Sequence, residues 1–277
     1  MLMDAYGYSS QNITVLRDDD PTKMPTKANI WIALQSIVAA SGPTDEIWFH
    51  YSGHGTQIRD TNGDEADRLD EAIVPVDYLT VGMIGDDELF NLVRSIRCRA
   101  FLVFDSCHSG SVCDLQYSIN YVNGSFSKSV SSSKSIANPQ IVLLSGCRDA
   151  QTSADAYDNT AKEAGGALSI SLVDALRKNG HNADIMKIYN DVCYGLMSAK
   201  YTQIPVLSSS TLLPTWRFAR PNGPSASVLP AKMPTTSTVS LASKKVQVAP
   251  KQVYVGPPTT FAFAGVARRQ PRLSLNL

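Results

Sequence analysis

Short apolar runs alternate along this chain with longer segments in which apolar residues recur three or four positions apart. The short runs predict strands at residues 12–16, 46–51, 72–76, 100–104, 141–144 and 204–207. The longer segments predict helices at residues 28–40, 86–97, 167–178 and 183–199. Such alternation is typical of an α/β fold, in which helices cover the faces of a mainly parallel sheet.

Two segments lack this pattern. Residues 118–138 are dominated by Ser, Asn and Lys, which predicts a long surface loop. From Pro221 onward the chain holds 8 of its 15 prolines and has no clear periodicity. We therefore expect one folded domain at residues 1–218, followed by an extended, disordered tail at residues 219–277.

The formal net charge of zero conceals an asymmetry between these two parts. Residues 219–277 contain 8 of the 25 basic residues and no acidic residue. The remaining 17 basic residues face all 25 acidic residues in residues 1–218, which gives this part a net charge of −8. An acidic body favours cations or basic substrates, and it argues against binding to nucleic acid.

The composition of the chain also indicates where in the cell the protein is expected. No apolar run approaches the roughly 18–20 residues of a membrane-spanning helix, and the first residues lack the features of a secretory signal. The five cysteines are an odd number without a CxxC pair, which argues against a disulfide scaffold and against a four-cysteine zinc site. We therefore expect a soluble protein of the cytoplasm, without a membrane span.

Candidate chemistry follows two of the predicted strands. His54 stands between two glycines after the strand at residues 46–51, and Cys107 follows the strand at residues 100–104. Ligands bind beyond the carboxyl ends of parallel strands, where an imidazole can help a thiol become a nucleophilic thiolate. The amides of Gly55 and Cys107 are suited to stabilising an oxyanion. The alternative is that His54 is a turn residue and Cys107 a core residue.

The segments YSGHG at residues 51–55 and DSCHSG at residues 105–110 resemble the two signature motifs of metacaspases, the caspase-like cysteine peptidases of protists, fungi and plants. The likeness runs from about Gly7 to Ser210. It includes LDEAIVPVD at 69–77, GDDE at 85–88, Asp114-Leu115, SGC at 145–147 and QTSA at 151–154. The undivided chain and the short interval between the two signature motifs are similar to the type I branch of the family.

The resemblance implies a caspase-hemoglobinase-like fold, a three-layer sandwich of a mainly parallel sheet with helices on both faces. Metacaspases normally have a strand and a helix before the region equivalent to Gly7, and this segment carries an acidic residue of the substrate pocket. Residues 1–6 do not match it. We therefore expect a peptidase domain at residues 1–218 that is short at its N-terminus and lacks a central strand.

The resemblance also implies peptide hydrolysis after Arg or Lys by a Cys–His dyad, with His54 as general acid-base and Cys107 as nucleophile. Asp105 offers a carboxylate that can pair with an Arg side chain, and Ser52 matches a second position of the substrate pocket. The alternative for Asp105 is a strand-end carboxylate that holds a neighbouring loop. We expect peptides or proteins with Arg or Lys at the cleavage site as partners, and a monomeric enzyme.

Four aspartates match positions that bind calcium in similar metacaspases, namely Asp70, Asp86, Asp87 and Asp114. Oxygen ligands from separate loops suit a hard cation such as Ca2+, and without one the four carboxylates repel each other. Asp114 lies close after Cys107 in the sequence, so calcium is expected to order the loop that follows the nucleophile. The alternative is that Asp86 caps the helix that follows it.

The resemblance also implies self-cleavage after Lys. The candidate sites are Lys128, Lys134 and Lys162, which lie in segments that are predicted to be exposed. The alternative is that these three residues only add solubilising charge. Two other functions remain open. The missing N-terminal segment and the basic tail favour a catalytically impaired, metacaspase-like regulator or scaffold. A hydrolase that acts on a non-peptide substrate fits the Cys–His dyad but not Asp105.

Overall fold

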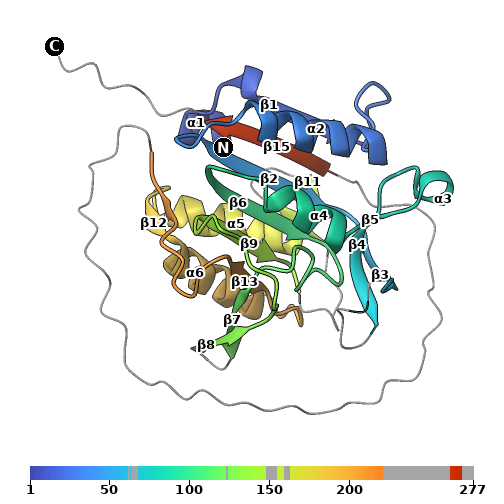
Figure 1. Ribbon diagram of the computed structural model, residues 1–277. Coiled ribbons are helices and arrows are strands. Elements are labelled where there is room, and N and C mark those ends of the chain that lie inside the picture. The colour runs from blue at the N-terminus through green and yellow to red at the C-terminus, as the bar shows by residue number, and fades with distance from the viewer. Residues whose placement is uncertain are drawn as a thin grey trace.

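An eight-stranded sheet with helices packed on both faces organises the chain (Figure 1). The computed structural model describes residues 1–61, 63, 68–122, 124–147, 155–158, 163–220 and 263–269. In spatial order the strands of the sheet are β1 (Ile13–Arg17), β15 (Phe263–Arg269), β2 (Glu46–Ser52), β6 (Arg99–Asp105), β9 (Ile141–Ser145), β13 (Val206–Ser209), β7 (Tyr117–Val122) and β8 (Ser125–Val130).

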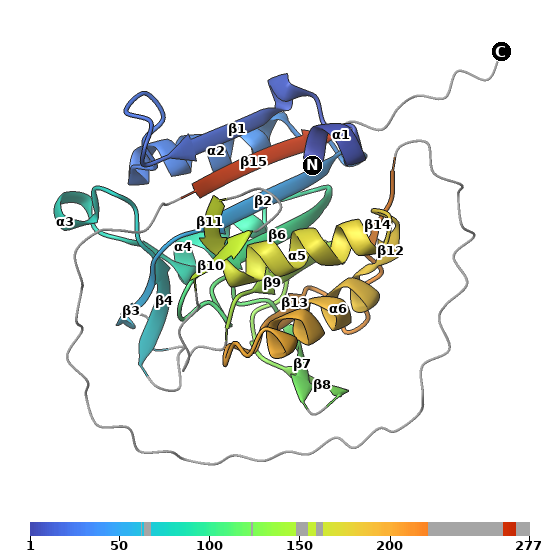
Figure 2. The ribbon, with the colours of Figure 1, turned by 180° about the vertical axis from the view of Figure 1, so that it is seen from behind.

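Four longer helices form the outer layers. α2 (Lys27–Ala40) and α4 (Asp86–Val93) cover one face of the sheet, and α5 (Ala167–Lys178) and α6 (Ile185–Ser198) cover the other (Figures 1 and 2). The predicted α/β class and its three layers are therefore confirmed. None of the helices in the described part of the chain combines the length and the apolar character that crossing a bilayer requires.

The smaller elements lie around the margins of the sheet. The short helices are α1 (Leu2–Tyr6), η1 (Ser10–Asn12) and α3 (Tyr78–Val81). The small sheets are β3 (Gly55–Arg59) with β4 (Leu69–Ile73) and β5 (Ile84–Gly85), β10 (Asp155–Asp158) with β11 (Glu163–Gly166), and β12 (Ala183–Asp184) with β14 (Arg217–Phe218).

The centre of the large sheet is parallel and its margins are antiparallel. Strands β2, β6 and β9 pair in parallel. Strands β13, β7 and β8 continue the sheet antiparallel on one side, and β15 joins it antiparallel on the other. The sheet predicted as mainly parallel is therefore mixed, with a parallel core. Because parallel neighbours end at the same edge, the segments after β2 and β6 are brought together.

Side chains of the central strands alternate between two hydrophobic layers. In β2, Phe49 and Tyr51 pack with α2 and α4, whereas Trp48 packs with α5 and α6. In β6, Phe101 and Val103 face the same layer as Trp48. A strand that is covered on both faces needs apolar residues at nearly every position, which explains the continuous apolar runs in the sequence.

The prediction of a loop at residues 118–138 is wrong for the first part of this segment, because β7 and β8 form a hairpin at the edge of the sheet. Val122 pairs with Ser125, and Gly124 has a φ of +80°, which glycine adopts without strain. The Asn-Gly sequence at residues 123–124 is a strong hairpin signal. The serines conceal the strand pattern because an edge strand buries few of its side chains.

The prediction of a disordered tail at residues 219–277 is wrong for residues 263–269, which form β15. This strand pairs antiparallel with β1 on one side and with all of β2 on the other. Strand β15 therefore joins β1 to β2, in the sheet where the sequence predicts that a central strand is lacking. Its sequence, FAGVARR, mixes small and basic residues and gives little of the alternation by which a strand is recognised.

Candidate active site

The turns that carry His54 and Cys107 are in contact. Ser52 and Asp105 form the last pair between β2 and β6, and the amide of Gly53 donates to the carbonyl oxygen of Asp105 at 3.2 Å. A Cβ on Gly55 would lie 2.0 Å from the carbonyl oxygen of Cys107, so only glycine fits there. The predicted convergence of the two turns is therefore observed.

Hydrogen bonds shape the turn at Cys107. The Ser109 hydroxyl donates to the carbonyl oxygen of Ser106 at 2.8 Å, and the Cys147 thiol donates to the same oxygen at 3.4 Å. His108 has a φ of +49°, a left-handed conformation that reverses the chain directly after the cysteine. Cys107 is half-buried in this turn, whereas the two residues before it are buried.

The backbone of the His54 turn is also held. Its carbonyl oxygen accepts hydrogen bonds from the Tyr51 hydroxyl at 2.8 Å and from the Val74 amide at 3.1 Å. Tyr51 is fully buried, and burial raises the pKa of its hydroxyl, with a further contribution from negative charge on Cys107. The imidazole of His54 lies exposed at the surface.

Solvent access separates Cys107 from the other cysteines. All five lie in described residues, and Cys107 is the one that is not buried. Burial raises the pKa of the Cys193 thiol to about 12, and it raises that of Cys113 well above its usual range. Buried thiols of this kind stay protonated and unreactive. Cys107 is therefore the cysteine best suited to meet a substrate.

Asp105 ends β6 with its carboxylate buried at the N-terminus of α5. Its Oδ2 accepts a hydrogen bond from the amide of Ser169 at 2.7 Å. Gly166 is the N-cap of α5, and a Cβ there would lie 2.0 Å from the same oxygen. The Asp105 carboxylate therefore replaces the missing N-cap side chain, and the helix N-terminus favours its negative charge. The alternative considered for Asp105 is a carboxylate that holds a neighbouring loop, and the segment that it contacts is the first turn of α5.

Three further side chains adjoin Asp105 on this face of the sheet. Ser52 is its register partner and is half-buried. His50 Nε2 lies 2.8 Å from the Ser169 hydroxyl, and burial lowers the pKa of His50 to about 4, so the imidazole is neutral at physiological pH. Ser169 is not among the site residues that the sequence predicts. The glycine before the predicted helix at residues 167–178 is the one local signal for this contact.

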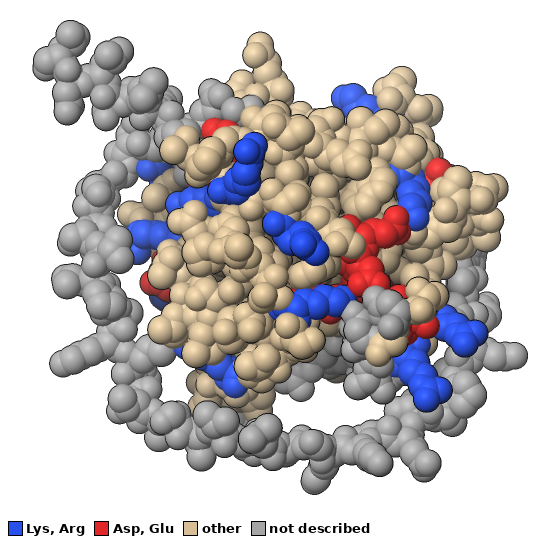
Figure 3. Space-filling model, in the orientation of Figure 1, with Lys and Arg blue, Asp and Glu red and all other residues tan. Residues whose placement is uncertain are grey.

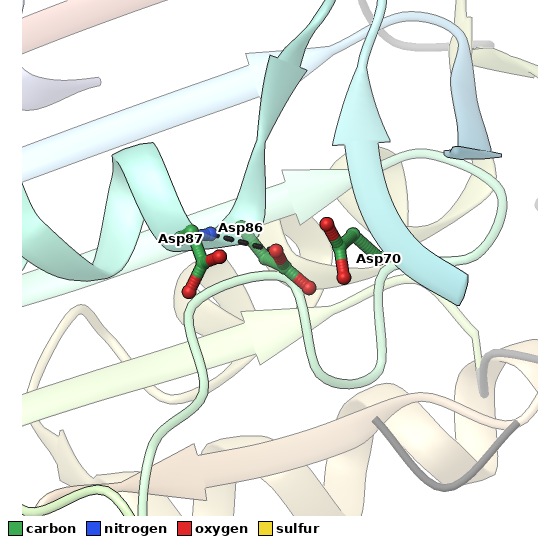
Figure 4. A group of neighbouring side chains, drawn as sticks. All are labelled: Asp70, Asp86 and Asp87. Atoms are coloured by element: carbon green, nitrogen blue, oxygen red, sulfur yellow. Dashed lines mark hydrogen bonds between the residues drawn. The ribbon is translucent and has the colours of Figure 1, made fainter. Parts of the chain in front are cut away.

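The four aspartates Asp70, Asp86, Asp87 and Asp114, called here the acidic cluster, meet near the start of α4. Figure 4 shows Asp70 on β4 and the adjacent pair Asp86 and Asp87 at the first turn of α4. One carboxylate oxygen from each of these three lies within 4.8 Å of the others. Figure 3 shows acidic side chains gathered on the surface near β4 and α4.

Asp86 is the most deeply buried member of the acidic cluster. It accepts hydrogen bonds from the amides of Glu71 at 3.0 Å and of Asp87 at 2.6 Å. Burial raises the pKa of Asp86 to about 7, and the carboxylates of Asp114 and Asp70 add to the rise. The N-cap of α4 is Gly85, so the alternative that Asp86 is the helix cap is wrong.

Asp114 joins the acidic cluster through Lys134. The Lys134 ammonium lies 2.6 Å from Asp114 Oδ2 and 2.8 Å from Asp87 Oδ1. The sequence places Lys134 in an exposed loop, whereas its side chain is only 21% exposed and is bound to two carboxylates. Oxygen donors from three separate segments, with an ammonium already standing between two of them, fit a hard cation such as calcium.

The other two lysines considered for self-cleavage differ from Lys134. Lys128 lies on β8 at the edge of the sheet and is half-buried. Lys162 lies outside the described residues, as does the segment at residues 151–154.

Similarity to known proteins identifies the family of the chain. A sequence model of the metacaspase peptidase C14 domain matches residues 1–116. Metacaspase-1A of Neurospora crassa is 34% identical over 258 residues, which cover 76% of this chain and 56% of that protein. Metacaspase-1A of Aspergillus niger is 36% identical over 253 residues, which cover 74% of this chain and 62% of that protein. The chain belongs to the metacaspase family.

Two further facts define the extent of this likeness. The chain spans little more than half the length of these relatives. The crystal structure of protein GSU0716 from Geobacter sulfurreducens matches with a TM-score of 0.50 and 24% sequence identity, over 72% of this chain and 79% of that one. This second likeness concerns the fold alone.

Proposed function

We propose that this protein is a cysteine endopeptidase that cleaves after Arg or Lys and is stimulated by calcium. The observation that carries the proposal is the contact between the His54 and Cys107 turns at the carboxyl ends of two parallel strands. Membership of the metacaspase family and the accessibility of Cys107 support it.

The proposed reaction begins with transfer of the Cys107 thiol proton to His54. The thiolate attacks the carbonyl carbon of the scissile peptide bond, and the amides of Gly55 and Cys107 stabilise the resulting oxyanion. The tetrahedral intermediate collapses as the C–N bond breaks, and His54 gives the proton to the leaving amine. Water then hydrolyses the thioester, with His54 as general base, and the Cys107 thiol is regenerated.

Asp105 and Ser52 are proposed to recognise the basic side chain of the substrate. They lie side by side at the ends of β6 and β2, next to the Cys107 turn. The α5 N-terminus favours a charged Asp105 carboxylate, which attracts a guanidinium or ammonium group. Proteins or peptides with Arg or Lys at the cleavage site are therefore the proposed substrates.

Calcium is proposed to bind the acidic cluster. Asp70, Asp86, Asp87 and Asp114 would hold it, since oxygens of the first three lie within 4.8 Å of one another and Asp114 shares the Lys134 ammonium with Asp87. The ion would supply positive charge that offsets their mutual repulsion. Asp114 belongs to the loop that follows Cys107, so this neutralisation stabilises the segment next to the nucleophile.

Hydrolysis of a fluorogenic Arg peptide, with calcium and with a chelator, tests the proposal. We expect calcium-dependent hydrolysis that is lost in Cys107→Ala and in His54→Gln. The matched control is His181→Gln, because His181 lies beside Tyr6, on the turn that follows α5, and should leave the rate unchanged. Full activity in Cys107→Ala would contradict the mechanism, and full activity in chelator would contradict the role of calcium.

A further inference from the structure

Lys134 lies within the acidic cluster, where its ammonium contacts Asp87, Asp114 and Phe90 among the described residues. It is bound to Asp87 and Asp114, and it lies 5.3 Å from the centre of the Phe90 ring. Asp114 is buried, so this ion pair is shielded from solvent on one side. A lysine of this kind acts as a counter-ion, because it supplies positive charge where like charges are held together.

The backbone around Lys134 is attached on both sides of it. Before it, the Ser131 amide donates to the carbonyl oxygen of Gln116 at 2.9 Å, and the Ser131 hydroxyl donates to that of Leu115 at 2.8 Å. After it, the Asn138 side chain donates to the carbonyl oxygens of Ile96 and Cys98. The Lys134 side chain can therefore leave the acidic cluster by rotating about its own bonds, without unfolding of the segment.

The same carboxylates serve Lys134 and the proposed metal ion. Asp87 and Asp114 bind the ammonium, and both belong to the set of four that would hold calcium. A divalent cation that uses the same oxygens repels the ammonium at a few ångströms. The two cations therefore exclude each other, and the ion with the higher charge and more ligands is favoured at sufficient concentration.

We propose that Lys134 is a built-in counter-ion of the acidic cluster, which calcium displaces when it binds. This inference rests on the calcium part of the proposed function. Displacement frees the Lys134 side chain from the loop that follows Cys107.

Calcium titration by calorimetry tests the displacement. The full chain carrying Cys107→Ala, which prevents self-cleavage, is compared with the same chain carrying Lys134→Met as well. We expect calcium to bind the second protein about tenfold more tightly, because no ammonium has to be displaced. Lys128→Met is the matched control and should leave the affinity unchanged. Lys134→Arg retains the charge and should stay within about threefold of the parent.

Chemical labelling gives a second readout that is independent of affinity. Acetylation of lysines by a water-soluble ester, followed by mass spectrometry, reports how accessible each ammonium is. We expect calcium to increase labelling of Lys134 at least about fivefold and to leave that of Lys128 unchanged, since an ion-paired amine reacts slowly.

Each result decides the inference. Equal or weaker calcium binding by the Lys134→Met protein overturns it, and so does labelling of Lys134 that calcium does not change. If no variant binds calcium, although circular dichroism and thermal unfolding verify their folding, the inference falls together with the calcium part of the proposed function. Hydrolysis of the Arg peptide then still tests the peptidase part separately.

Discussion

Two centres of negative charge flank the Cys107 turn, and they are neutralised in different ways. On the α5 side, the single carboxylate of Asp105 meets a backbone amide and the N-terminus of a helix. On the α4 side, four carboxylates meet, and the cation bound between Asp87 and Asp114 is the ammonium of a side chain. A backbone amide cannot leave its site, whereas a lysine side chain can.

This difference matches the two roles proposed for this edge of the sheet. The fold fixes the position of Asp105, as the proposed recognition of a basic residue requires. The acidic cluster is held by the Lys134 side chain, which the proposed response to calcium requires to be exchangeable. We therefore expect changes on the α5 side to alter hydrolysis of Arg peptides, and changes on the α4 side to alter the response to calcium.

Gly166→Ala should break the α5 side most severely. The added Cβ would lie 2.0 Å from Asp105 Oδ2 and 2.3 Å from its Cγ, so the whole carboxylate has to move. We expect kcat/KM for an Arg peptide to fall at least about 100-fold, as displaced catalytic geometry does elsewhere. Gly195→Ala is the control, because the nearest atoms are 3.8 Å away. Unchanged affinity for calcium would show that the two sides are independent.

The pH dependence of stability should also report on the α5 side. The unfolded chain binds a proton on His50 near pH 6.5, whereas the folded chain does so only near pH 4, so acid favours unfolding between these values. The free energy of unfolding should fall by about 2–3 kcal/mol over this window. In His50→Gln this contribution should be lost, as measured by urea unfolding across the pH range. If the free energy of unfolding changes with pH equally in wild type and in His50→Gln, a neutral, buried His50 is excluded. His54→Gln, which changes an exposed histidine, is the control.

Asp105→Asn should separate charge from position on the α5 side. The amide oxygen can still accept the hydrogen bond from Ser169, but the charge that attracts Arg is gone. The preference for an Arg peptide over its citrulline isostere should fall about 30-fold, or about 2 kcal/mol. Calcium affinity should not change. A retained preference for Arg would place the specificity elsewhere.

Asp86→Asn changes the α4 side and should have the smallest effect. Unlike the other substitutions, it should make the protein more stable. Removing one buried charge from the acidic cluster relieves repulsion, so metal-free protein at pH 8 should become more stable by about 1 kcal/mol. Thermal unfolding in chelator measures this gain, and calcium should stabilise the variant less than the wild type. Asp4→Asn, at an exposed side chain, is the control. A loss of stability in chelator would show that Asp86 is not under repulsion.

The sequence was sufficient for features that depend on local pattern. The apolar runs of β2 and β6 and the glycines around His54 predicted the two turns and their contact. The helix at residues 167–178 was predicted with the bounds that α5 has. These features follow from burial on both faces of a sheet and from helical spacing, which adjacent residues reveal.

Features that depend on contacts between distant segments were not predictable in this way. Nothing near Lys134 in the sequence indicates that its ammonium meets Asp87, and no motif indicates that Gly166 adjoins Asp105. Strand β15 was missed because its pairing with β1 and β2, and not its own composition, makes it a strand. The partner in each case is chosen by the three-dimensional fold.

Labelling of Cys107 by a peptidyl Arg chloromethylketone tests the central claim most directly. Mass spectrometry of the intact protein and of its peptides should show one adduct, on Cys107, because the other four cysteines are buried. His54→Gln should slow the labelling at least about 100-fold, since the imidazole takes up the thiol proton. Failure of the folded protein to form this adduct, or an adduct on a different cysteine, would contradict the assignment of Cys107 and His54 as the catalytic pair.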